Sequence, residues 1–173
     1  RRFAQGAPCL APAFAASLDA MTGPYRYKAF ISYAHADKKT AAWLFRRIES
    51  FRTPKALIGA GGEWGQVGER LTPVFRDREE LSTAHALGDV LTEALKNSEF
   101  LIVLCSPNSA RSRWVNEEIK AFRNFHGGRK VLAIIAEGDP GSAVGEGLQG
   151  CFPPALLAPA VEGGAPEEPI AAD

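Results

Sequence analysis

The chain has 173 residues, of which 46% are hydrophobic and 23% charged, and this composition predicts one globular domain with a buried core. Its 20 basic and 20 acidic residues balance, so neither nucleic acid nor an anionic membrane surface is expected as a partner. The three cysteines, Cys9, Cys105 and Cys151, lack metal-ligand spacing and predict a reducing, cytoplasmic setting without a disulfide framework.

No apolar run approaches the roughly 18 residues of a membrane-spanning helix. Residues 1–24 contain an Ala-rich stretch broken by Gly and Pro, and we interpret them as a disordered leader or upstream extension rather than a secretion signal. Residues 25–140 alternate between strand-like and helix-like patterns and form the predicted domain. Residues 141–173 are rich in Gly, Pro and Ala, and predict a tail that completes the last strand and leads into a further C-terminal region.

The first half of the predicted domain contains two strands and one helix. Tyr27–Tyr33 is a short β-rich apolar run typical of a strand, and Asp37 is predicted to cap the helix that follows. The buried stripe of that helix is expected to consist of Ala41, Leu44, Phe45, Ile48 and Phe51. Gly59–Gly68 predicts a loop. Leu71–Phe75 is predicted to be an edge strand, because Pro73 lacks the amide proton that a central strand needs.

The second half begins with a charged loop and a second helix. Apolar residues at helical spacing predict that its buried stripe contains Leu87, Val90, Leu91, Ala94 and Leu95. The continuous apolar run Phe100–Cys105 predicts a strand covered on both faces, which makes Cys105 a buried thiol. Pro107–Ser112 predicts a turn whose last residue caps a third helix, from Arg113 to about Phe125.

Two further strand patterns complete the predicted sheet, Lys130–Ala136 and the start of a fifth strand in Glu168–Ala172. Strands that alternate with helices imply parallel crossovers and a doubly wound α/β fold, here flavodoxin-like with strand order 2-1-3-4-5. Ligands of such sheets bind beyond the carboxyl ends of the strands, at the switch point between strands one and three. The loops at that point are Ala34–Asp37 and Ser106–Ser112, and the second leads directly into the third helix.

The third helix carries the most informative pair of residues, Trp114 and Glu118. On a helical wheel Glu118 lies between Trp114 and the buried stripe, whereas Glu117 faces outward. Glu118 is therefore placed to hold a partly desolvated carboxylate beside an aromatic wall, a setting in which carboxylates do chemistry. Spacing alone favours a plainer interpretation, in which the tryptophan packs and the acid pairs with Arg111 or Arg113.

Searches for other chemistry find no phosphate-binding glycine loop, no dinucleotide fingerprint, no nucleophile elbow and no His/Cys set suited to zinc. A metal site is therefore not expected. His35, His85 and His126 are isolated, and each is predicted to be a surface residue. His35 is the best candidate among them for a functional role, because it lies in the loop after the first strand.

Three regions, read together, resemble the sequence boxes of a bacterial TIR (Toll/interleukin-1 receptor) domain. They are Ala29–Asp37, Pro73–Leu81, and Phe100–Asn108 followed by Ser112–Ile119. Each box is modest alone, whereas their order and spacing together are highly specific. The resemblance implies the flavodoxin-like fold inferred above and one of two functions: homotypic assembly, or cleavage of NAD⁺ at the nicotinamide–ribose bond.

The resemblance also implies roles for individual residues. Glu118 occupies the position of the catalytic glutamate of NAD-cleaving members, four residues after the tryptophan of this helix. The substrate would be lined by Tyr33, Ala34, His35, Leu87 and Trp114. Many active relatives carry an arginine just after the first-strand tyrosine, where this chain has Ala34-His35. NAD⁺ would be the substrate, so no cofactor is implied.

Self-association with other TIR domains is a further implication. The so-called BB loop would make this contact through Asp77, Arg78, Glu79, Glu80 and Leu81. The insert Lys55–Glu69 is longer than in compact TIR domains and is expected to reshape an assembly face.

The favoured function is an NAD⁺ glycohydrolase or cyclase that is active on self-association and serves bacterial antiphage signalling. A TIR scaffold without turnover is the alternative, and Glu118 at the required position favours the enzyme over it. A more remote alternative is a nucleoside deoxyribosyltransferase-like enzyme, which the order of the boxes disfavours.

Overall fold

The computed structural model describes residues 25–63, 65–76, 84–141, 150–159 and 171–172, so the predictions for residues 1–24 and for Asp77–Leu81 lie outside it. Its centre is a five-stranded parallel sheet in the order β4-β1-β5-β6-β7. These strands are β1 (Tyr27–Ser32), β4 (Val74–Phe75), β5 (Ser98–Cys105), β6 (Val131–Ile135) and β7 (Ala171–Ala172). Numbered by chain order within this sheet they run 2-1-3-4-5, which confirms the predicted flavodoxin-like order.

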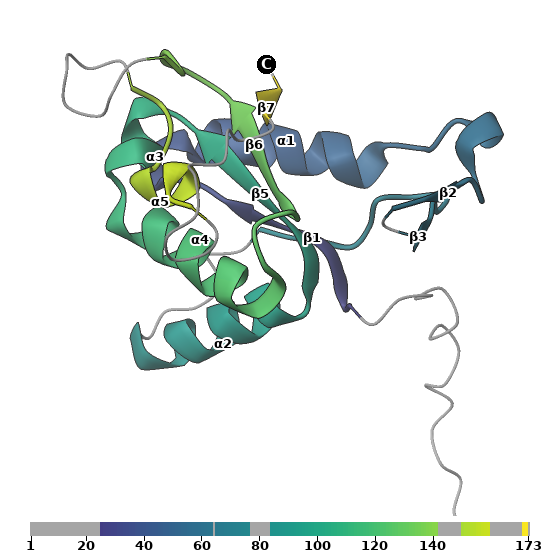
Figure 1. Ribbon diagram of the computed structural model, residues 1–173, viewed down its shortest axis with the longest axis horizontal. Coiled ribbons are helices and arrows are strands. Elements are labelled where there is room, and N and C mark those ends of the chain that lie inside the picture. Colours follow the sequence, from purple (N-terminus) through teal and green to yellow (C-terminus); the bar gives the residue numbers. More distant parts are fainter. Residues whose placement is uncertain (1–24, 64, 77–83, 142–149, 160–170, 173) are drawn as a thin grey trace, which may run out of the picture.

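Helices cover both faces of the sheet (Figure 1). They are α1 (Lys38–Ser50), α2 (Ala84–Lys96), α3 (Pro107–Arg111), α4 (Arg113–His126) and α5 (Pro154–Leu157). One face packs on α1, and the other packs on α2, α4 and α5. Each face of the sheet has its own hydrophobic core, and alternate residues of β5 belong to one or the other. Leu101 and Val103 face α4, whereas Ile102 and Leu104 face α1. The prediction that this strand is covered on both faces is therefore confirmed.

The first helix follows its predicted pattern with two corrections. Ala41 and Leu44 are buried against the sheet, as expected from their spacing. Phe51 lies beyond the end of α1 and is exposed, because the chain has already turned to extended geometry there. Asp37 occupies the N-cap position, but its side chain makes no capping hydrogen bond. A short 3-10 turn, η1 (His35–Asp37), precedes α1, and the Asp37 carboxylate bonds elsewhere, as described below.

Two segments predicted to be irregular form regular structure instead. Gly59–Gly68 was expected to be a loop, yet it contains the antiparallel strands β2 (Gly61–Gly62) and β3 (Gly65–Gln66). Pro107–Ser112 was expected to be a turn, yet its first five residues form α3. The reason is local: Ser106 caps this helix by accepting hydrogen bonds from the amides of Asn108 and Ser109, and Pro107 is pre-organised for a first helical turn.

The remaining boundaries follow the predicted pattern closely. β4 is an edge strand, as Pro73 indicated, but only Val74 and Phe75 pair with β1. In α2 the expected stripe is buried at Ala94 and Leu95, whereas Val90 is exposed. Ser112 caps α4 by accepting the Val115 amide at 3.3 Å, as predicted.

Part of the Gly/Pro/Ala-rich segment is packed into the core. Cys151, Phe152 and Leu156 are buried in the same cluster as α4. The Arg123 guanidinium on α4 donates hydrogen bonds of 2.6, 2.9 and 2.7 Å to the carbonyls of Ala155, Leu156 and Ala158. This arginine therefore fastens α5 to α4. Farther along, Ala171–Ala172 pairs with β6, as the pattern of a fifth strand predicted.

Candidate functional site at the carboxyl edge of the sheet

The carboxyl ends of β1 and β5 lie side by side, because the two strands are parallel and in register from Tyr27 opposite Ser98 to Ser32 opposite Val103. The chain leaves β1 into the loop of Ala34 and leaves β5 into α3 and α4. Residues distant in sequence are thereby brought to one edge of the sheet, at the switch point where α/β folds bind ligands.

Glu118 has a buried carboxylate at this edge. It is only 7% exposed, and Ser32 Oγ donates a 2.5 Å hydrogen bond to Glu118 Oε2. A bond this short between a hydroxyl and a carboxylate is of the strong, charge-assisted kind. Ser32 is itself buried, so this bond holds the carboxylate in a fixed place relative to the end of β1. The neighbouring Glu117 instead pairs with Lys120 on the surface, as the helical wheel indicated.

Trp114 lies one turn before Glu118, and its side chain is 69% exposed. The described part of the chain therefore leaves this ring largely in solvent, so the expected aromatic wall is open. Burial around Glu118 comes with Val115 and Ile119 on the same helix, both of which are fully buried. Packing of α4 against the core, rather than the Trp114 ring, therefore accounts for the burial of Glu118.

The three residues predicted to line the site from the first strand fall in different places. Tyr33 is buried in the core beneath α1, because strand alternation sends it to the face opposite Ser32. Ala34 is buried as well, whereas His35 is exposed. Of these three, His35 alone offers its side chain to solvent.

A second polar cluster joins the two loops of the switch point. Asp37 accepts hydrogen bonds from Ser106 Oγ at 2.6 Å and from Asn108 Nδ2 at 3.0 Å. Because Ser106 also caps α3, the loop after β1 and the start of α3 are fastened to each other. We refer to these three residues, Asp37, Ser106 and Asn108, as the loop clamp.

Sequence reasoning missed both the clamp and Ser32. A signal for Ser32 exists, since it shares a strand face with the buried Phe30, where a polar residue needs a partner. The side chain of Leu87 lies outside the described residues, as does the whole segment Asp77–Leu81.

Cys105 ends β5 directly beneath this edge. Its thiol is fully buried, as predicted, and burial raises its pKa from an ordinary value of 9.0 to about 12, with a smaller contribution from Cys151. It is therefore a protonated, unreactive core residue at neutral pH.

In the described ranges, no set of three or more His, Cys, Asp or Glu side chains is arranged to hold a metal ion. Among the helices of those ranges, none combines the length and apolar character needed to cross a membrane.

Three comparisons with known proteins give matches, and the family-model match covers most of the chain. The family model described as "Thoeris protein ThsB, TIR-like domain" matches residues 30–140. The NAD(+) hydrolase ApTIR of Actinoplanes sp. is 35% identical over 114 residues, which are 66% of this chain and 14% of that protein. The chain thus spans a small part of that relative's length. The TIR domains of the activated Roq1 resistosome, which directly recognises the pathogen effector XopQ, show 24% identity and a TM-score of 0.45, covering 66% of this chain and 60% of that chain.

Proposed function

Because the chain belongs to the family of TIR-like domains of the Thoeris protein ThsB, we propose that it cleaves NAD⁺ at the nicotinamide–ribose bond. The products would be nicotinamide and either ADP-ribose or a cyclic isomer of it. The 35% sequence identity to a protein named as an NAD(+) hydrolase supports this reaction class. The Thoeris family also supports a place for the reaction in bacterial antiphage signalling.

One observation carries the proposal: the buried Glu118 carboxylate that Ser32 holds at the carboxyl edge of β1. Cleavage of the N-glycosidic bond releases neutral nicotinamide and leaves positive charge on the ribose. A fixed, poorly hydrated carboxylate stabilises that charge more strongly than water does, because it need not reorganise during the reaction. Water then adds at the anomeric carbon and releases a proton, or a hydroxyl of the same ADP-ribose adds instead.

The exposed residues around Glu118 suit an open substrate site. Trp114 offers an unshielded ring on which a flat nicotinamide or adenine base could stack, and His35 offers a polar edge from the β1 loop. Tyr33 and Ala34 would act indirectly, by shaping the backbone beneath that loop. Leu87, whose side chain lies outside the described residues, remains a candidate contact through the family resemblance. We further propose that a second copy, docking through Asp77–Leu81, closes the open flank and makes activity depend on assembly.

The test is nicotinamide release from NAD⁺ by concentrated protein. Glu118→Ala is expected to reduce turnover at least about 100-fold, the usual size of the effect when a catalytic carboxylate is removed. Glu117→Ala is the matched control, because its carboxylate lies one residue away but faces solvent. If wild-type protein releases no nicotinamide when assembled, or if Glu118→Ala matches it, the chain is a scaffold without turnover.

A further inference from the structure

The insert before β4 forms a closed arm, which we define as the described residues 53–63 and 65–69. At its base the Thr53 amide donates to the Glu69 carbonyl at 3.1 Å, and Thr53 Oγ1 donates to the Gly68 carbonyl at 2.7 Å. Farther out, the Gly59 amide donates to the Val67 carbonyl, and the two strands β2 and β3 continue the ladder. The arm is therefore a hydrogen-bonded ribbon that projects from the body (Figure 1).

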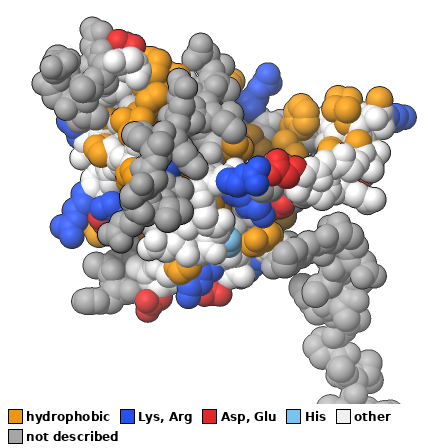
Figure 2. All heavy atoms as spheres, viewed as in Figure 1, with side chains coloured by type: hydrophobic (Ala, Val, Ile, Leu, Met, Phe, Trp, Pro, Cys, Tyr) orange, Lys and Arg blue, Asp and Glu red, His pale blue; other side chains and the backbone are white. Residues whose placement is uncertain are grey.

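The surface of this arm is unusually apolar for a projection into solvent. Leu57 is 52% exposed, and Ile58 and Val67 are exposed beside it. Figure 2 shows hydrophobic side chains gathered along the arm, away from the main body of the protein. The tip is braced by an ion pair between Glu63 and Arg129, which precedes β6. Exposed aliphatic groups on an ordered projection are typical of surfaces that bind another protein.

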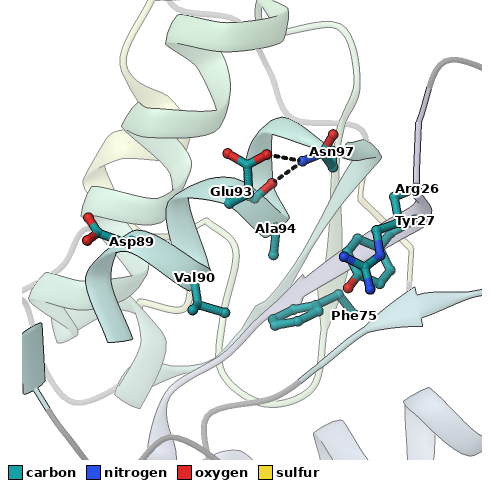
Figure 3. Close-up of a pocket in the computed structure, with 8 residues that line it drawn as sticks. All are labelled: Arg26, Tyr27, Phe75, Asp89, Val90, Glu93, Ala94 and Asn97. Carbon is teal, nitrogen blue, oxygen red and sulfur yellow. Dashed lines mark hydrogen bonds between the residues drawn. The ribbon is translucent and has the colours of Figure 1, made fainter. Parts of the chain in front are cut away.

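A groove of about 460 Å³ lies between α2 and the first strands of the sheet (Figure 3). Its floor is aromatic, with the rings of Tyr27 and Phe75 at 5.1 Å and an edge-to-face angle. Val90 on α2 contributes an apolar wall that is 42% exposed. Asp89 and Glu93 give the α2 side of the groove a negative charge, whereas Arg26 lines the side next to the start of β1. The volume is in the range of clefts that accept a small ligand or a few side chains.

We infer that the arm of one copy of this chain docks into the groove of another. Leu57 and Ile58 would fill the apolar groove over Phe75. Lys55 begins the 3-10 turn η2 (Lys55–Leu57), and its ammonium group would pair with the Asp89 carboxylate. Both surfaces are apolar, and the positive charge of Lys55 is complementary to the negative charge of the α2 side of the groove.

The groove lies at the starts of β1 and β5, and the arm is paired with Arg129 just before β6, so both surfaces lie at the amino edge of the sheet. Glu118 lies at the carboxyl edge. An arm-in-groove contact therefore leaves the proposed site open. The inference stands whether or not the chain cleaves NAD⁺.

Sedimentation velocity of the whole chain tests the contact through complementary variants. Leu57→Asp places a charge on the arm, and Val90→Lys places one in the groove. Each is expected to weaken self-association at least about tenfold, because a charge would be buried without a partner. An equimolar mixture of the two contains one intact arm and one intact groove per pair. It is expected to form a 1:1 dimer and nothing larger.

Charge reversal gives a second test that does not depend on apolar packing. Lys55→Asp and Asp89→Lys are each expected to weaken association, and the double variant is expected to restore it. Trp43→Asp is the matched control for Leu57→Asp, since it adds the same charge at an equally exposed apolar residue on α1, outside the arm and the groove. Circular dichroism confirms that every variant is folded.

Three outcomes would overturn the inference: a monomeric wild type, single variants that associate as wild type does, or a mixture that fails to dimerise. Loss of association only on substitution of Asp77 or Glu80 would also overturn it, while leaving the proposed BB-loop contact intact. Nicotinamide release, measured separately, reports on the proposed function and not on the arm.

Discussion

Two buried serines stand at opposite edges of the sheet and use their hydroxyls differently. Ser98, at the amino end of β5, donates to the Ala94 carbonyl four residues away, at 2.7 Å. Ser32, at the carboxyl end of β1, donates to a carboxylate 86 residues away. The first bond completes a local turn from helix to strand. The second holds a carboxylate contributed by another element, α4. The buried hydroxyl at the amino edge therefore has a local structural role, whereas the one at the carboxyl edge positions a charged side chain.

The same contrast extends to the neighbours of these serines. At the carboxyl edge the loop clamp ties together segments about 70 residues apart, through Asp37 and its partners. At the amino edge the arm and groove leave apolar side chains in solvent. Polar groups held in place suit a site for chemistry, whereas unpartnered apolar groups suit a site for association. Substitutions at the two edges test whether they differ in this way.

The largest expected effect concerns the fastening of α5 to the helix that carries Glu118. Arg123→Ala removes three short hydrogen bonds from a cation to carbonyls, and we expect it to lower the free energy of unfolding by about 3 kcal/mol. Chemical denaturation measures this loss. Lys120→Ala, which breaks only the exposed pair with Glu117, should change stability by less than about 0.5 kcal/mol. Equal losses in the two variants would show that α5 contributes little to holding α4.

The next effect separates the two serines directly. Ser32→Ala is expected to lower the rate of NAD⁺ cleavage about 10- to 100-fold with little change in KM, because the hydroxyl orients Glu118 rather than binding substrate. Ser32→Thr keeps a hydroxyl and should recover part of the rate.

Ser98→Ala is the matched control for that experiment. It removes an equally buried hydroxyl at the other edge, so it should reduce stability by about 1 kcal/mol and leave the rate unchanged. If the two alanine variants lose activity alike, the distinction between the edges is wrong.

A smaller effect depends on pH. The Cys105 pKa is about 12 in the folded chain against an ordinary 9.0, so the unfolded chain loses this proton first as pH rises. The contribution of the protonated thiol to the free energy of unfolding is therefore complete below pH 9 and is lost between about pH 9 and 12. By pH 10 the loss amounts to roughly 1 kcal/mol. Comparing the unfolding free energies of wild type and Cys105→Ala at pH 8 and pH 10 isolates it. Parallel changes in the two proteins would contradict the assignment.

The smallest effect is expected at the tip of the arm. Arg129→Ala breaks the exposed ion pair with Glu63, and we expect less than about 1 kcal/mol of lost stability. Thermal unfolding of the variant beside the wild type measures the difference. A loss above this limit would mean that the arm is integral to the fold rather than a braced projection.

The sequence predicted the sheet order correctly because its strand and helix patterns alternate and because parallel crossovers permit few arrangements. It also distinguished Glu118 from Glu117, since helical periodicity decides which carboxylate turns inward. It could not predict the open position of Trp114, because exposure depends on what covers a helix rather than on the helix itself. Gly59–Gly68 was expected to be a loop since propensity alone does not reveal a ladder closed by Thr53.

The partners of buried polar groups were the least predictable part. Asp37 has the sequence position of a helix cap, but Ser106 and Asn108 bind it from a distant segment. Nothing local in the sequence signals that choice, because it depends on tertiary placement of the two loops. Ser32 could have been noticed from its place on an apolar strand face, although its partner could not.

The loop clamp has a consequence for the substrate site proposed at this edge. The loop after β1 is held at one end by the strand and at the other by Asp37, so its path does not depend on the exposed side chains between them. His35 and Ala36 can therefore be exchanged while the loop keeps its place. At the proposed substrate site, specificity would then depend on the identity of these exposed residues, and an arginine introduced at either position is expected to leave the fold of the loop unchanged.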